Sequence, residues 1–421
     1  GREIHCEIIK EGVLLKDVLI GTALIDMYVK CSMIQKAQEV FNDLRFHDIV
    51  SWTSIIAGYN QSGDSEKGLD SLSRMQAESC HPDSMTLSCI LKTCGSVGAI
   101  DKGKEVHAMI HSKGKLLLKN VVLGNALVSM YAKCGLLIEA HTIFDKLYVQ
   151  SLVSWNVLIA GYCYLDRGED ALNSFKWMQC KYGLSPDAVT FASILKACGS
   201  ICATQKGMKI HADIVKRGLL ENNSVLGTAL LDMYAKSGLL TQTQEVFDKL
   251  PVRDVVAWTS LISGYADHDD VDKAIKCFEL MQLEGVKADR VIFVCILRAC
   301  ACMGDMDKVQ EIHEDIERNG LLGKDLVLGT TLVGIYAKHG FLAQARFVFD
   351  KLRIRNVVSW NTMISGYCQH GQYEKALDYF EHMKCDDFSP NEVTFLCALK
   401  ACGSVGAAQK GEQIHSTIVR E

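Results

Sequence analysis

Apolar residues in this chain recur at helical spacing, as in the stretch VVSWNTMISGY at residues 357 to 367. Its apolar positions fall at i, i+3, i+4 and i+7, which predicts one helix with a single apolar face. A second apolar set follows Gly371, where a break is expected. The first set is Trp360, Met363, Ile364 and Tyr367, and the second is Ala376, Leu377, Phe380 and Met383. The pattern predicts two helices joined by a turn.

This two-helix pattern repeats along the whole chain in units of three types. Standard units, which carry the Trp, occupy 49–83, 152–187, 255–289 and 357–391. Short units occupy 18–48, 121–151, 224–254 and 326–356. Long units occupy 84–120, 188–223 and 290–325, with partial long units at 1–17 and 392–421. Pro82, Pro186 and Pro390, near the ends of three standard units, are expected to stop the second helix.

A single helix hairpin cannot cover its own apolar faces, so neighbouring hairpins must stack to bury them. No linker rich in Pro, Gly or Ser interrupts the series of units. The sequence therefore predicts an all-α fold in which eleven complete units and two partial ones form one continuous α-solenoid.

Composition and charge narrow the possible partners. Hydrophobic residues make up 48% of the chain and charged residues 23%, as expected for a chain that forms a core. The net charge of −5 argues against indiscriminate binding of polyanions, although a local basic stripe would escape that objection. The longest apolar run, VIFVCIL at 291–297, is too short to span a bilayer, so no membrane partner is expected. The chain has no initiator Met or targeting segment, and we expect it to be a piece of a longer protein.

Cysteine and histidine positions argue against a disulfide framework or a metal site. The 18 cysteines do not recur systematically, since equivalent positions hold Cys31, Cys134, Ser237 and His339. We expect them to be reduced and structural, in a reducing compartment. One histidine recurs per three units, and stacked helices about 10 Å wide would hold these histidines too far apart to share a metal. The recurring histidines are His5, His107, His211, His313 and His415.

Catalytic motifs are equally weak. The run His5-Cys6-Glu7 matches the H-x-E of zinc deaminases, but no P-C-x-x-C partner stands in the chain. The sequence contains no phosphate-cradling glycine loop and no nucleophile elbow. We therefore expect no catalysis, metal or cofactor in this segment.

The recurring residues resemble those of a known family. The pattern V-V-S-W-N-x-x-I-x-G-Y, with A-L-x-x-F-x-x-M and a terminal P-D or P-N, resembles the pentatricopeptide repeat. It differs from the tetratricopeptide repeat, which is about 34 residues long with an early Trp, Leu, Gly and Tyr arrangement. The alternation of short, standard and long units resembles the plant PLS subclass. The resemblance implies a right-handed superhelical α-solenoid that reads single-stranded RNA, one base per repeat, with two or three side chains.

In that family the reading side chains are the fifth and the last residue of each unit. Asp only accepts hydrogen bonds, which suits G or U, whereas Asn or Ser can donate, which suits A or C. At the fifth position, a short Thr leaves room for a purine and a longer Asn reaches a pyrimidine. The predicted pairs are Thr22 with Asp48 (G), Thr53 with Asp83 (G), Asn125 with Ser151 (C), Asn156 with Asp187 (U), Thr228 with Asp254 (G), Thr259 with Asp289 (G), Thr330 with Asn356 (A) and Asn361 with Asn391 (C).

The long units give no firm assignment. Ser88 with Asn120 leans towards A and is left open, while Ala192 and Val294 at the fifth position offer no polar group. Because RNA runs 5′ to 3′ from the N- to the C-terminus in this family, the implied target is approximately GG-n-CU-n-GG-n-AC. The same polar residues are also ordinary helix caps. A polar fifth residue is kept in short and standard units but becomes Ala192, Val294 and Leu396 in long ones, which favours readout over capping alone.

Two further sets are implied to contact RNA. Valines at the second position resemble the family's apolar clamp on a base face, although taken alone they are as expected in a core: Val50, Val122, Val153, Val225, Val256, Val327 and Val358. Lysines at position 13 of the short units correspond to phosphate-facing residues, although a solvated Lys is the plain alternative: Lys30, Lys133, Lys236 and Lys338.

The sequence thus predicts an RNA-binding module rather than an enzyme. Resemblance to the PLS subclass implies a parent protein that guides C-to-U editing of transcripts in a mitochondrion or chloroplast, with editing cofactors or a deaminase domain as partners. The transit peptide and the deaminase domain are not in this sequence. The alternative is a protein-binding scaffold of the tetratricopeptide type, which would hold a peptide in its groove.

Overall fold

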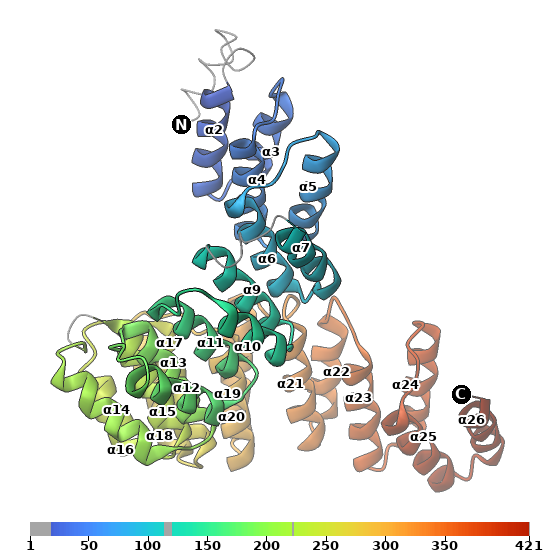
Figure 1. The fold of residues 1–421 in the computed structure, drawn as a ribbon. Coiled ribbons are helices and arrows are strands. Elements are labelled where there is room, and N and C mark those ends of the chain that lie inside the picture. Colours follow the sequence, from blue (N-terminus) through green and yellow to red (C-terminus); the bar gives the residue numbers. More distant parts are fainter. Residues whose placement is uncertain (1–17, 113–119, 221–222, 421) are drawn as a thin grey trace. The chain divides into compact units, whose positions relative to one another are not determined.

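The computed structural model describes residues 18–112, 120–220 and 223–420, and these residues form 24 helices arranged in consecutive pairs (Figure 1). The all-α prediction is confirmed. Each interval assigned to a complete unit holds one pair, and 392–421 holds a pair as well. The partial unit 1–17 and the run His5-Cys6-Glu7 lie outside the described residues.

The first helix of each pair, called a first helix below, is 13 or 14 residues long. The first helices are α2 (Val18–Lys30), α4 (Ile49–Ser62), α6 (Ser84–Val97), α9 (Val121–Lys133), α11 (Leu152–Tyr164), α13 (Ala188–Ser200), α15 (Ser224–Lys236), α17 (Val255–Asp267), α19 (Arg290–Met303), α21 (Leu326–Lys338), α23 (Val357–Gln369) and α25 (Glu392–Val405). Consecutive first helices pack against each other, as α9 does against α11 and α11 against α13.

The second helix of each pair packs on its own first helix and on the first helix of the next unit. The second helices are α3 (Ile34–Asp43), α5 (Ser65–Ala77), α7 (Ile100–Ser112), α10 (Leu137–Lys146), α12 (Gly168–Cys180), α14 (Thr204–Lys216), α16 (Leu240–Asp248), α18 (Val271–Leu283), α20 (Met306–Arg318), α22 (Leu342–Lys351), α24 (Tyr373–Cys385) and α26 (Ala408–Arg420). In short units these helices have 9 or 10 residues rather than 13, which accounts for the shorter repeat.

The Trp of each standard unit fixes the contact with the preceding short unit. Trp155 meets Phe144 of α10 edge to face, with ring centroids 4.7 Å apart, and Trp360 meets Phe349 of α22 in the same way at 4.8 Å. Such aromatic pairs add roughly 0.5–1.5 kcal/mol to the burial of their area. The predicted stripes of the last standard unit, from Trp360 to Met383, are buried in this core. The repeated Trp is therefore a packing residue.

The Gly-Tyr step in each standard unit reflects close approach of two first helices. A Cβ atom built on Gly161 would lie 2.6 Å from the Cβ of Ala132, and one on Gly366 would lie 2.6 Å from that of Ala337. Real Cβ atoms do not approach so closely. Glycine is thus required where the standard first helix crosses the short one.

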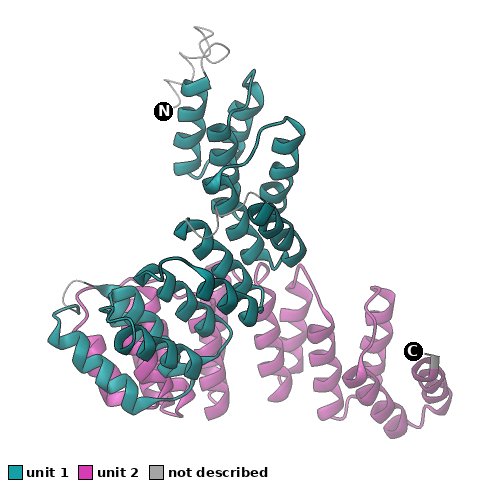
Figure 2. Cartoon of the chain, viewed as in Figure 1, with its two compact units in different colours: residues 1–229 teal, residues 230–421 magenta. Residues whose placement is uncertain are grey.

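The chain divides into two compact units, residues 1–229 and 230–421, with the boundary inside α15 (Figure 2). Each compact unit is a stack of helix hairpins of the kind just described. The right-handed superhelical sense expected from the resemblance stays a prediction.

Prolines near the ends of standard units do not terminate the second helices, and that prediction is wrong. Helix α5 ends at Ala77 and α12 at Cys180, five and six residues before Pro82 and Pro186. Each proline instead directly precedes the residue that caps the next first helix, such as Asp83. A residue before the cap lies outside the helix, where the missing N–H of proline costs no helical hydrogen bond.

Cysteine and histidine side chains serve packing. All 17 cysteines in the described residues are free, and burial raises the pKa of the Cys94 and Cys300 thiols to about 11. The Nδ1 atom of His107 lies 2.8 Å from the Tyr131 hydroxyl of the following short unit, and that of His313 lies 3.1 Å from the Tyr336 hydroxyl. No cluster of three metal-ligating side chains occurs within the described ranges. No described helix has the length and apolarity to cross a membrane.

Candidate nucleic-acid interface

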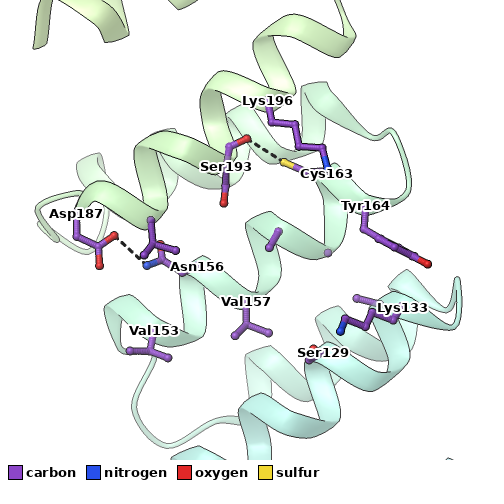
Figure 3. Close-up of a pocket in the computed structure, with 14 residues that line it drawn as sticks. Ser129, Lys133, Val153, Asn156, Val157, Cys163, Tyr164, Asp187, Ser193 and Lys196 are labelled. Atoms are coloured by element: carbon purple, nitrogen blue, oxygen red, sulfur yellow. Dashed lines mark hydrogen bonds between the residues drawn. The ribbon is translucent and has the colours of Figure 1, made fainter. Parts of the chain in front are cut away.

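A groove of about 560 Å³ lies across the first helices α9, α11 and α13. It is lined by residues that the sequence predicts for three separate roles: Asn156 and Asp187 for base reading, Val153 for base stacking and Lys133 for phosphate contact (Figure 3). These four residues come from two consecutive units, 121–151 and 152–187. Lateral packing of first helices is what places them on one surface.

Asn156 and Asp187 meet at the floor of this groove. The Asn156 amide donates from Nδ2 to Oδ1 of Asp187 over 3.1 Å, and the hydroxyl of Thr190 donates to Oδ1 of Asn156 over 2.6 Å. Asp187 is the N-cap of α13, where the same Oδ1 accepts the Thr190 N–H at 2.8 Å. Asn156 is buried, so this network holds its amide in one orientation.

The charge state of Asp187 is set by opposing effects. Burial raises the pKa of its carboxyl, but the hydrogen bonds from the Thr190 N–H, the Thr190 hydroxyl and the Asn156 amide lower it, and the net shift is downward. Asp187 is therefore an anion at neutral pH. All bonds to its side chain fall on Oδ1, and within the described residues Oδ2 accepts none. One carboxylate oxygen remains available in the groove.

A second pair repeats this arrangement in residues 230–421. The Asn361 amide donates to Oδ1 of Asn391 over 2.8 Å, and the Thr394 hydroxyl donates to Oδ1 of Asn361 over 2.5 Å. In the first standard unit the link is indirect. The hydroxyls of Thr53 and Thr86 lie 2.7 Å apart, and Thr86 bonds the Asp83 carboxylate at 2.8 Å.

Other predicted pairs have no direct hydrogen bond in the described contacts: Thr22 with Asp48, Asn125 with Ser151, Thr259 with Asp289 and Thr330 with Asn356. Thr228 and Asp254 belong to different compact units. Four fifth-position threonines donate instead to the carbonyl four residues earlier, at 2.7–2.8 Å: Thr22, Thr53, Thr228 and Thr259. The Thr330 hydroxyl and the Asn125 carbonyl oxygen are buried and have no partner in the described residues.

Capping by the last residues, the alternative left open by the sequence, is confirmed. Asp48, for example, accepts the Ser51 N–H at 2.7 Å, and Asp254 accepts the Ala257 N–H at 2.9 Å. Last residues with the same role are Asp83, Ser151, Asp187, Asp289, Asn356 and Asn391. In Asp48 and Asp254, as in Asp187, the cap occupies Oδ1 alone among the described contacts. Capping and base reading are therefore compatible in one carboxylate.

The second-position valines are not core residues. The seven valines predicted from sequence are 53–65% exposed. The first helices of the first short unit and of the long units also expose an apolar side chain at this position, which the sequence reading missed: Leu19, Met85, Val189, Val291 and Val393. Isolated exposed apolar residues are ordinary, but here one stands at the same position of every first helix, which makes this surface a candidate for ligand contact. The sequence signal for these residues is that an apolar residue recurs at the second position of every unit.

The short-unit lysines differ in their surroundings. Lys30 pairs with Asp26 at 2.7 Å and Lys236 with Asp232 at 2.8 Å, each on its own helix. Lys133 lines the groove, and Lys338 is exposed. The sequence reading missed an exposed cation at the ninth position of each long first helix: Lys92, Lys196, Arg298 and Lys400. Lys196 lines the same groove as Lys133, so two basic side chains share the groove with Asn156 and Asp187.

Comparison with known families returns repeat models along most of the chain. A model of the PPR repeat family matches residues 47–96, 150–200, 253–302 and 355–404, and a second PPR repeat model matches 22–49, 125–148 and 291–321. Together the matches cover more than half of the chain. The recurring residues that define the standard units fall inside the first set.

Curated relatives are pentatricopeptide repeat-containing proteins of Arabidopsis thaliana. One named as mitochondrial is 32% identical over 419 residues, which covers 99% of this chain and 40% of the relative. Another mitochondrial protein is 33% identical, with 100% and 60% covered, and a chloroplastic one is 34% identical, with 98% and 50% covered. The chain spans about half the length of the curated relatives it matches.

Among solved structures, the pentatricopeptide repeat protein PPR10 from maize matches with a TM-score of 0.75 at 16% identity, covering 100% of this chain and 61% of that chain. PPR10 in complex with an 18-nt psaJ RNA element matches with a TM-score of 0.54 at 18% identity, covering 95% and 69%. At these identities the likeness concerns the fold.

Proposed function

Because this chain belongs to the pentatricopeptide repeat family, we propose that it binds single-stranded RNA along its first helices, one base per repeat, with sequence specificity. The groove across α9, α11 and α13 carries the proposal. It combines a hydrogen-bonded polar pair, exposed apolar side chains and two lysines, which are the groups that read, stack on and neutralise a nucleotide. The RNA-bound structure of PPR10, which shares the fold, supports the same ligand class.

Asn156 and Asp187 suit uracil. The free Oδ2 of Asp187 accepts the N3–H of the base, and the second hydrogen on Nδ2 of Asn156 donates to a neighbouring carbonyl oxygen. Asn361 and Asn391 differ at the last residue, where an amide replaces the carboxylate. The Asn391 Nδ2 donates to the ring nitrogen of cytosine, which carries no hydrogen.

Pairs of Thr and Asp suit guanine for a related reason. The hydroxyl hydrogens of Thr22 and Thr259 are engaged by carbonyls of their own helices, which leaves each hydroxyl oxygen as an acceptor for a base. Thr53 makes the same bond to its helix and also contacts the Thr86 hydroxyl. Asp is also an acceptor, and the guanine edge offers two N–H donors. The proposed target remains approximately GG-n-CU-n-GG-n-AC, read 5′ to 3′ from the N-terminus.

Apolar clamps and cations supply affinity that does not depend on sequence. Val153 and Val189 present exposed methyl groups on either side of the Asn156 and Asp187 pair, and covering them with a base face gains about 25 cal/mol per Å². Lys133 and Lys196 are placed to neutralise phosphates of the same nucleotides. Lys30 and Lys236 can exchange an exposed intrahelical carboxylate for phosphate at little cost, since such exposed pairs are worth about 0–1 kcal/mol.

The deciding experiment is equilibrium binding to a short RNA with the proposed bases against one in which the GG and CU blocks are exchanged. We expect tighter binding of the first RNA, by about 1–3 kcal/mol for each mismatched base, by analogy with bidentate base readout. Affinity for both RNAs should fall as salt rises. Equal, salt-insensitive affinity would instead favour a peptide-binding scaffold.

We propose that this chain selects a transcript and contributes no catalysis of its own. The alternation of unit types supports a role in C-to-U editing, with editing cofactors or a deaminase domain acting beside it. The mitochondrial and chloroplastic relatives support an organellar location. Sequencing organellar transcripts from plants that lack the gene tests the proposal: a cytidine that stays unedited beside a matching site supports it, and a full set of edited sites contradicts it.

A further inference from the structure

A recurrent contact joins the first helix of three standard units to that of the following long unit. A side chain at the twelfth position of the standard unit donates to the backbone carbonyl at the sixth position of the long unit. The donor and acceptor pairs are Asn60 with Cys89 (3.0 Å), Cys163 with Ser193 (3.2 Å) and Cys368 with Cys397 (3.4 Å). An amide and two thiols make the same bond, so the packing of the two helices determines this contact and the chemistry of the donor does not.

Only one of the four equivalent places brings two thiols together. The other three combine Asn60 with Cys89, Cys163 with Ser193 and Ala266 with Cys295. At the fourth, Cys368 of α23 is buried and Cys397 of α25 is half-buried. The Sγ atom of Cys368 lies 3.4 Å from the carbonyl oxygen of Cys397, which places the Cys368 thiol beside the residue that carries the second thiol. Solvent thus reaches this thiol pair through Cys397.

The two thiols are unequal in reactivity. The neighbouring Cys368 side chain lowers the pKa of Cys397 to about 7, against the effect of burial and with help from the Lys400 charge. The pKa of Cys368 is raised by the Cys397 side chain and by burial. The more exposed sulfur is therefore the nucleophile and the buried one the resolving thiol, an arrangement typical of oxidisable cysteine pairs.

We propose that Cys368 and Cys397 are an oxidation site at which a hydroperoxide closes an intrachain disulfide between α23 and α25. The Cys397 thiolate attacks the peroxide O–O bond, forming a sulfenic acid and releasing water when the oxidant is hydrogen peroxide. The Cys368 thiol then attacks the sulfenic sulfur, and a second water leaves. Overall two thiols and one hydrogen peroxide yield one disulfide and two waters, with two electrons passing from sulfur to oxygen.

The disulfide would lie on the seam that holds the Asn361 and Asn391 pair. Cys368 is two helical turns after Asn361 on α23, and Cys397 follows Asn391 on the partner helix. Closing the bond fixes the spacing of α23 and α25 and with it the geometry of that pair. An effect on base preference rests on the proposed RNA-binding function, whereas closure of the disulfide does not.

Peroxide treatment of the full chain, followed by alkylation and peptide mass analysis, tests the site. We expect Cys368 and Cys397 to be lost together from the alkylated pool, with a linked peptide lighter by two hydrogen atoms. Cys163 beside Ser193 is the internal single-thiol control and should remain alkylatable. The proposal is overturned if Cys368 stays alkylatable while Cys397 is oxidised to sulfinic acid or bonded to another chain.

Two substitutions sharpen the test. Oxidation should raise the melting temperature of the parent chain, because the disulfide joins α23 to α25. Cys397→Ser should abolish both this rise and the linked peptide. Ser193→Cys recreates the pair in the earlier triplet, next to Cys163, and should yield a second linked peptide under the same treatment. If the Ser193→Cys chain melts like the parent but forms no second linked peptide, the placing of two thiols at this helix contact is not what causes the disulfide to form.

Loss of base discrimination at the Asn361 position after oxidation, with the linked peptide present, would extend the effect to RNA binding. A linked peptide with unchanged discrimination, in a chain that binds the proposed RNA, would confine the effect to stability. No RNA binding at all would overturn the proposed function and leave the oxidation site standing.

Discussion

The side-chain amide of Asn156 lies 3.1 Å from the Oδ1 atom of Asp187, which stands 31 residues further along the chain. Asn156 lies on α11 and Asp187 caps α13, so the bond ties two neighbouring first helices together in the groove. A base bound there would contact residues at both helices at once. Single substitutions at this pair should therefore alter one position of the RNA without unfolding the chain.

Asn156→Thr should shift the preferred base at that position from U to G. In the variant, we expect the Thr hydroxyl to donate to the Leu152 carbonyl, as Thr259 does to Val255, which leaves an acceptor beside the Asp187 carboxylate. The change in preference should be about 1–3 kcal/mol. Competition binding with RNAs that differ only at this base measures it.

Thr259→Asn is the reciprocal control and should move preference from G towards U at its own position only. If both variants weaken all RNAs equally, Asn156 and Thr259 contribute to packing and not to readout.

Lys133→Gln and Lys196→Gln should each weaken binding to every RNA alike. Both lysines line the groove, and each phosphate contact contributes about −0.7 to the log-log slope of affinity against salt for single strands. The four short-unit lysines together predict a slope of roughly −3. Titrations over a range of salt concentrations measure the slope for each variant.

Lys30→Gln tests a lysine outside this groove. Because the exposed pair of Lys30 with Asp26 at 2.7 Å exchanges for phosphate at little cost, we expect the slope to change by a similar amount. A slope that stays constant in all three variants would show that these lysines do not contact phosphate.

Gly366→Ala should destabilise the chain by about 1–3 kcal/mol, the usual cost of overpacking. The new Cβ would lie 2.6 Å from the Cβ of Ala337, and helices α21 and α23 must separate to admit it. Chemical denaturation measures the free energy of unfolding.

Gly334→Ala is the matched control in the interior of α21, where the nearest atom, Cγ2 of Thr362, is 3.5 Å away. This control should be neutral or stabilise by about 0.5–1 kcal/mol, because alanine favours helix more than glycine does. Equal effects of the two substitutions would contradict the close approach of first helices.

Asp187→Asn should reduce stability at neutral pH but not in acid. The folded-state pKa of Asp187 is lowered below the ordinary value of 3.8, so its carboxylate stabilises the fold above that pH. This stabilisation is lost as pH falls through the folded pKa. Asparagine caps helices as well as aspartate does, so the difference isolates the charge at the helix N-terminus, about 0.5 kcal/mol.

Thermal unfolding of the two chains at pH 7 and below pH 3.8 measures the difference. If the difference in melting temperature between the two chains persists in acid, the substitution acts through lost packing and not through the charge of Asp187.

Much of the fold follows from local sequence. Helix spacing around Trp360 and the break at Gly371 predict the hairpin because both depend on neighbouring residues of one helix pair. Recurrence of the hairpin predicts stacking, since no hairpin covers itself. Helix ends are less well predicted by the sequence. The sequence suggests that Pro82 ends α5, but Pro82 lies beside the residue that caps the next helix. Its place depends on how the loop crosses from one unit to the next.

At the candidate site, the sequence alone determined which positions carry polar side chains, and only tertiary structure decided what those side chains do. The amides of Asn156 and Asn361 are held by the hydroxyls of Thr190 and Thr394, which stand at the third position of the next first helix. Thr259 faces a unit with Ile292 at that position. In the same way, Val153 is exposed because no neighbouring helix in the described part of the chain covers its face. Cys368 contacts Cys397 because the next first helix packs against its face. Periodicity places a residue on a face of its own helix, but only the packing of another helix against that face determines whether it is buried, exposed or bonded.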